Sequence, residues 1–240
     1  MSSFITHISE QDVRSTSTVR GGTLLGAYGG TADGRIYRWS KAGAVDLAAG
    51  KVNVTPARAT NHANRTLATG SAIGSYTVQV PVGATAVTQD QYKDGTLTVN
   101  DGVGEGITYL IEGNTSAASS GTTTVTLSEP IKVALTSASD VTLDVSACDL
   151  LIVSPSAVAH NAAGVNNVAI TASTFGWVQV KGYCSVLSDG IVTKGAGAIL
   201  SDAVAGAVEI EVAATVTNRV ANAVEASVDT EYSLFNLCLF

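Results

Sequence analysis

The chain has 240 residues, of which 45% are hydrophobic and only 14% are charged, where about a quarter is usual in a soluble domain. Its 20 acidic and 13 basic residues give a net charge of −7, which disfavours a nucleic-acid partner. No stretch approaches the roughly 18 uninterrupted apolar residues of a membrane-spanning helix, and the first residues lack the pattern of a secretory signal. We therefore expect no membrane partner, and synthesis in the cytoplasm.

Short strands are predicted along most of the chain, because Val, Thr, Ala and Gly dominate and the strong helix formers are scarce. The first 20 residues are polar and without periodicity, which indicates an extended N-terminal arm. Apolar residues then alternate with polar ones or form short runs at 76–82, 96–100, 107–111, 122–127, 131–135, 141–145, 150–153, 168–171, 177–181, 208–212 and 231–240. Asp-Gly pairs at Asp33, Asp94, Asp101 and Asp189 predict turns between strands.

This pattern predicts a mostly β chain, with antiparallel β-sandwich or barrel-like units, an extended N-terminal arm and little helix. We expect a first β domain over residues 21–154 and a second over 168–240. The Ala-, Asn- and Gly-rich stretch 155–167 reads as the linker between them.

Known catalytic signatures are missing, so we expect no enzyme, no cofactor and no metal. The glycines at 102–106 precede a strand-like run rather than the helix that a dinucleotide site needs. The three histidines, His7, His62 and His160, lie in polar surroundings without a nucleophile elbow. Asp101 and Glu105 could hold calcium weakly, but the DxDxDG pattern is absent. Carboxylates of a glycosidase meet only in the folded chain, but the 5% aromatic content disfavours a sugar cleft of that kind.

One hairpin concentrates the aromatic residues. In the run that follows the Asp33 turn, the side chains of Arg35, Tyr37 and Trp39 share one face of a strand. They can be core residues of a hairpin, or an anchor patch for a partner, since Trp, Tyr and Arg dominate binding hot spots.

Two segments give the sequence a family resemblance. The stretch 30–51, with its Asp-Gly-Arg-Ile-Tyr-Arg-Trp hairpin and a Gly-Lys end, resembles a segment of structural proteins of tailed bacteriophages. The stretches 219–226 and 229–234 are similar to the closing strands of phage capsid decoration (cement) proteins, although Thr230 stands where glycine is common. Together the segments cover about 15% of the chain.

The resemblance implies a non-enzymatic virion protein that binds the outer capsid surface and stabilises the shell. Its implied partners are the major capsid protein and copies of itself, commonly in a homotrimer. The residues we expect to contact the capsid are Phe4, Ile5, Arg14 and Arg20 in the arm, and then Arg35, Tyr37 and Trp39. The alternative is a tail-associated or surface adhesion module that binds a glycan or receptor, which the Asn-, Thr- and Ser-rich loops and scattered tyrosines favour.

Overall fold

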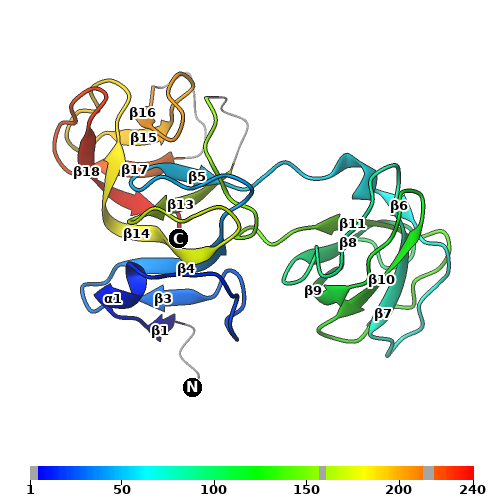
Figure 1. Cartoon of the computed structure of the whole chain (residues 1–240). Coiled ribbons are helices and arrows are strands. Elements are labelled where there is room, and N and C mark those ends of the chain that lie inside the picture. The colour runs from blue at the N-terminus through cyan, green and yellow to red at the C-terminus, as the bar shows by residue number, and fades with distance from the viewer. Residues whose placement is uncertain (1–4, 157–160, 213–218) are drawn as a thin grey trace. The chain divides into compact units, whose positions relative to one another are not determined.

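The computed structural model describes residues 5–156, 161–212 and 219–240. Short strands joined by turns make up most of these ranges, with a four-residue α-helix and a short 3-10 helix (Figure 1). The expectation of a mostly β chain with little helix is confirmed. Neither helix is long and apolar enough to cross a membrane.

The chain forms two compact units, and the second is an insertion in the first. Unit 1 contains Met1–Pro56 and Ala147–Phe240, and unit 2 contains Ala57–Ser146. The chain leaves unit 1 after β5 (Val52–Val54) and returns just before β12 (Ile152–Val153). Because β5 and β12 are antiparallel neighbours, the two connections start from adjacent strands of unit 1.

Unit 1 contains a mainly antiparallel sheet in which β1 pairs with β3 in parallel. The main path of this sheet runs β1-β3-β4-β14-β18-β17-β15-β16, and β2, β5, β12 and β13 pair beside it. Its other strands are β1 (Ile5–His7), β2 (Thr16–Ser17), β3 (Tyr28–Gly30), β4 (Ile36–Lys41), β13 (Ala162–Asn166), β14 (Phe175–Leu187), β15 (Gly197–Leu200), β16 (Val208–Ile210), β17 (Arg219–Ala223) and β18 (Tyr232–Cys238). Its largest core cluster joins Val52 and Val165 to Val186 and Phe235, so β5 and β13 pack against the β14–β18 side of the sheet.

This division of the chain differs from the expected domains 21–154 and 168–240, because strands from both ranges share the sheet of unit 1. The expected linker contains β13, in which Asn166 is fully buried. The Asn166 side chain accepts a hydrogen bond from Asn53 at 2.7 Å and donates one to the Leu47 carbonyl at 3.1 Å. Asparagine reads as a loop residue in the sequence, whereas here the amide satisfies buried polar groups in the core.

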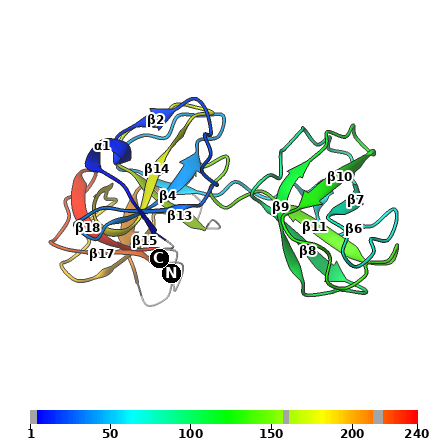
Figure 2. The ribbon, with the colours of Figure 1, turned by 90° about the horizontal axis from the view of Figure 1, so that it is seen from below.

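The N-terminal segment lies against the sheet. Ser9 and Asp12 form a capping box at the start of α1 (Glu10–Val13), and β1 and β2 pair with β3 and β14. Ile8 and Val13 are buried beside Tyr37 and Trp177, and Figure 2 shows α1 and β2 next to β14. Two apolar side chains therefore hold a segment that the sequence predicts as an extended arm.

Unit 2 is a sheet of six strands in the order β6-β11-β8-β9-β10-β7. Its elements are η1 (Thr60–His62), β6 (Arg65–Thr66), β7 (Thr77–Pro81), β8 (Thr96–Asp101), β9 (Thr108–Asn114), β10 (Thr122–Leu127) and β11 (Asp140–Asp144). The end strands β6 and β7 lie close together, so the sheet is a nearly closed barrel around its own core. The expected barrel-like character is confirmed in this unit.

A recurring turn begins many of the strands. Ahead of β5, β10, β14, β16 and β18 the chain makes a turn with a carbonyl-to-amide hydrogen bond across three residues. The third residue of each of these turns has positive φ, as a type II turn requires: Gly50, Ser120, Ser173, Gly206 and Thr230. Such turns favour glycine and other small residues, which are frequent in this chain. The four predicted Asp-Gly turns also contain a residue with positive φ.

Candidate functional site

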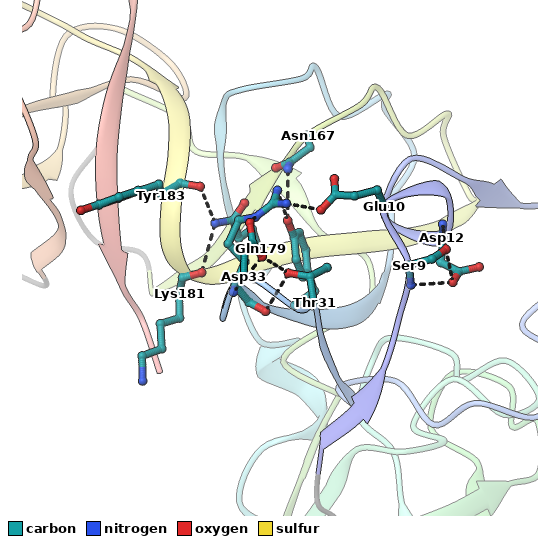
Figure 3. Close-up of polar contacts among 11 residues, drawn as sticks. Ser9, Glu10, Asp12, Thr31, Asp33, Asn167, Gln179, Lys181 and Tyr183 are labelled. Carbon is teal, nitrogen blue, oxygen red and sulfur yellow. Dashed lines mark hydrogen bonds and ion pairs between the residues drawn. The ribbon is translucent and has the colours of Figure 1, made fainter.

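Strand β14 brings the two family-like segments together. It pairs with β4 over Phe175–Lys181 and with β18 over Lys181–Leu187. Between these halves the register with β4 shifts, and Gly182 has a φ of +87°. The buried side-chain amide of Gln179 donates to the carbonyls of Lys181 at 3.0 Å and Tyr183 at 2.9 Å (Figure 3). This amide supplies hydrogen bonds at the irregularity and so stabilises the change of direction.

Arg35 lies over this irregular point of β14. A Cβ on Gly182 would come within 3.0 Å of the Arg35 Cγ, so the absence of a side chain there makes room for the arginine. The guanidinium donates to Asp33 at 2.6 Å and to the Tyr37 hydroxyl at 2.8 Å, and it forms an ion pair with Glu10. These contacts hold Arg35 in one orientation.

Two of the groups around Arg35, Asp33 and Tyr37, have shifted pKa values. The Thr31 hydroxyl, and then Arg35, lower the pKa of the Asp33 carboxyl. Burial raises the pKa of Tyr37 to about 12, so its hydroxyl stays protonated. Asn167 donates to that hydroxyl at 3.4 Å, and Figure 3 shows Glu10, Asp33 and Asn167 around the same network.

A groove of about 670 Å³ lies beside this network, on the outer face of β14 and β18. Tyr183 pairs with Asn236, and Leu187 with Tyr232, so the side chains of Tyr183 and Tyr232 emerge on the same face. Tyr183 is 60% exposed and Tyr232 is 53% exposed, so both rings are open to solvent on this face.

The Tyr232 ring packs directly on the backbone of unit 1. A Cβ on Gly50 would lie 2.6 Å and 2.8 Å from two carbons of this ring, so only glycine leaves room for it in this position. The ring therefore has one side supported by the protein and another side open to solvent.

The charge of the groove is opposite to that of the chain. Arg14 and Arg35 line it, and no aspartate or glutamate does, although acidic residues outnumber basic ones overall. Arg35 is already compensated by Glu10 and Asp33. Arg14 is exposed and makes no ion pair with any described residue, so it supplies the uncompensated positive charge.

The structure distributes the expected contact residues unevenly. Phe4 lies outside the described residues, Ile5 is half-buried in β1, and Arg20 is half-buried in the segment before β3. Tyr37 is fully buried, and Trp39 is 9% exposed. In this fold a partner cannot reach the side chain of Tyr37, because the N-terminal segment and the sheet enclose it.

Trp39 belongs to an aromatic cluster of the core. Its ring stacks against Phe175 at 6.2 Å between centroids and lies 5.1 Å from Trp177. The sequence allowed the hairpin aromatics to be core residues or an anchor patch, and the structure places Tyr37 and Trp39 in the core. Arg35 reaches the groove from the same strand face and remains 18% exposed.

The sequence interpretation did not single out Tyr183 or Tyr232 as site residues. The alternation along 181–187 and 231–240 does place both on a solvent-facing side, and this was the available signal. The capping-box spacing of Ser9 and Asp12 was a second signal, because it marks the helix that positions Arg14.

The described residues considered for a metal or for catalysis do not line the groove. Within 5–156, 161–212 and 219–240 no three His, Cys, Asp or Glu side chains are grouped to hold a metal, Asp101 and Glu105 included. His62, expected in a polar loop, is fully buried in unit 2, where its ring bonds to the Tyr92 hydroxyl and the Thr85 carbonyl. His160 lies outside the described residues.

Comparison with known proteins gave no match to a protein-family model, to a curated protein or to a solved structure.

Proposed function

We propose that this chain is a non-enzymatic structural protein of a tailed-phage virion that binds the outer capsid surface and stabilises the shell. The observation that carries the proposal is the meeting of the two family-like segments. The first contains β4 and the second includes the start of β18, and β14 pairs with both strands. Residues far apart in the sequence thus form one continuous part of unit 1, so the resemblance applies to one region of the fold.

The capsid contact in this proposal is made by the N-terminal segment at the margin of the sheet. β1 is the outermost strand on the described path of the sheet, and its Thr6 and His7 are exposed. The Ile5 side chain lies against Gly30, and Arg20 follows β2. Tyr37 packs beneath this segment with Ile8 and Val13, and Trp39 packs in the aromatic cluster of the core, so neither is assigned to the partner contact.

Sedimentation with undecorated shells tests the proposal. The variant Ile5→Asp with Arg20→Glu should lose at least tenfold in shell affinity, while tryptophan fluorescence confirms that unit 1 remains folded. Arg14 stays unchanged in this variant because it also lines the groove. Failure of the wild-type protein to bind shells would refute the function, and undiminished binding by the variant would refute the contact surface.

The proposed assembly is a homotrimer. Light scattering on the purified protein should then give about three times the chain mass of 24.3 kDa, in solution or after release from shells. A monomer in both states would refute this part of the proposal and leave shell binding to be judged separately.

A further inference from the structure

We propose that the groove on the β14–β18 face of unit 1 binds a short oligosaccharide that carries a carboxylate. This goes beyond capsid binding, since the groove and the β1 margin are formed by different residues. The volume of about 670 Å³ lies within the range of small-molecule sites, roughly 300–1,000 Å³.

The two tyrosines provide flat apolar surfaces at a suitable spacing. Tyr183 and Tyr232 are four positions apart in the β14–β18 register, which corresponds to about 13 Å along the strands. Leu234 and Ser185 face each other between them. A short saccharide spans that distance, and the less polar faces of its rings can pack on aromatic rings that stay exposed.

Hydroxyl groups between and on these surfaces are available for hydrogen bonding. The hydroxyls of Tyr183, Tyr232 and Ser185 have no hydrogen-bond partner among the described residues. Each can donate and accept, which matches the hydroxyls of a sugar. Asn167, by contrast, is occupied by Tyr37 and Cys184, so it forms part of the wall.

Charge determines the acidic character of the ligand. Arg14 is the uncompensated cation of the groove, and no carboxylate lines it. A guanidinium binds a carboxylate through paired hydrogen bonds, so a sugar acid gains a contact that a neutral sugar lacks. Because the net charge of the chain is −7, the rest of the surface disfavours anions, so an anionic sugar should bind at the groove rather than at other sites.

An acidic peptide is the rival occupant of this groove. β14 pairs with β18 over Lys181–Leu187, so the side chains of Tyr183 and Tyr232 stand out from the face of the sheet rather than along its hydrogen-bonding edge. Contacts to these rings favour a ligand with flat, weakly polar faces, and binding of hexaglutamate separates the peptide from the sugar acid.

Tri-galacturonic acid is the probe, and maltotriose is the neutral control of equal length. Isothermal titration of the full chain should give saturable binding of the acid, with a Kd of about 1 mM or tighter, and at least tenfold weaker binding of maltotriose. Absence of saturable binding of the acid, or equal affinity for both sugars, would overturn the proposal.

Variants locate the site. Tyr183→Ser with Tyr232→Ser should abolish binding, and Arg14→Gln should weaken only the acid, by about tenfold. Tyr76→Ser is the matched control, because Tyr76 is 52% exposed but belongs to unit 2. Unchanged binding by the double variant would overturn the assignment, as would equal affinity for hexaglutamate, which supplies charge without sugar rings. Shell sedimentation of the double variant should match wild type, so this proposal and the capsid proposal can fail independently.

Discussion

Replacing Gly50 by alanine tests whether the Tyr232 ring is positioned by the absence of a side chain beneath it. Gly50 has a φ of +70°, and an alanine there meets the ring at 2.6 Å. Gly195 is a matched control, because it also precedes a strand at the third position of a turn, with a φ of +78°, and has open space around it. Both substitutions carry the left-handed backbone penalty of about 1–2 kcal/mol, reduced by the lower entropy of the unfolded alanine chain.

Only Gly50→Ala must also move a ring. Turning Tyr232 away from its rotamer costs about 0.5–1.5 kcal/mol, and its packing against Gly50 is lost as well. We therefore expect Gly50→Ala to destabilise unit 1 by about 1–2 kcal/mol more than Gly195→Ala does. Because the ring is half exposed it can swing outward, so the variant should still fold.

Urea unfolding followed by tryptophan fluorescence measures this difference. Both tryptophans, Trp39 and Trp177, belong to unit 1, so the signal is independent of unit 2. In the background of Tyr232→Ser the extra cost of Gly50→Ala should disappear, which a double-mutant cycle shows directly. Equal unfolding midpoints for the two single variants, or an extra cost that persists without the ring, would refute the reasoning.

Three other outcomes follow from local features. Thr230 is a β-branched residue at a φ of +60°, so Thr230→Gly should raise the unfolding free energy of unit 1 by about 0.5–1 kcal/mol, and a lower urea midpoint would contradict this. Burial, with nearby Asp202, raises the pKa of Glu209 above its ordinary 4.5. The fold therefore disfavours the ionised carboxylate, and the free energy of unfolding falls as pH rises through the folded pKa. In urea titrations Glu209→Gln should stabilise the protein by less than about 1 kcal/mol at pH 7 and should have no such effect at pH 3. Ellman's reagent at pH 8 should modify exposed Cys238 first, because burial raises the pKa of Cys184 to about 12; rapid loss of the Cys184 thiol would disagree.

Local patterns in the sequence predicted much of the fold. The alternating stretch 122–127 coincides with β10, and 96–100 and 141–145 lie within a residue of β8 and β11. The stretch 131–135 was predicted as a strand but forms only an isolated bridge at Leu135, because its apolar residues fill the core of unit 2 from a loop. Alternation of apolar and polar residues indicates that every second side chain is buried, and a loop that crosses a core shows the same pattern as a strand.

Long-range organisation was not accessible in the same way. The insertion of unit 2 depends on β5 and β12 pairing across nearly a hundred residues of chain, and no local pattern encodes that pairing. The buried Asn53–Asn166 contact illustrates the difficulty, since asparagine in a small-residue stretch usually indicates a turn. Asn166 can be recognised as a core residue only in the folded chain, where the Asn53 amide lies opposite it.

The candidate site shows the same limit. The sequence identified the aromatic hairpin, but it could not tell which partner covers the hairpin, and the answer is the chain's own N-terminal segment. Tyr183 and Tyr232 each read as ordinary exposed strand residues. Their relation depends on the bend of β14 at Gly182 and on the contact of Tyr232 with Gly50, which are both features of the folded backbone.

The N-terminal segment therefore links the stability of unit 1 to the charge of the groove. Arg14 directly follows α1, a four-residue helix that is too short to persist alone and depends on its capping box and on buried Val13. Hydrogen bonds from Ser9 lower the pKa of the Asp12 carboxyl below its ordinary 3.8. The capping contribution is thus fully present above that value and is lost as pH falls through the folded pKa. In strong acid the helix loses the carboxylate contacts of its capping box, which weakens the hold on the position of Arg14 beside the groove.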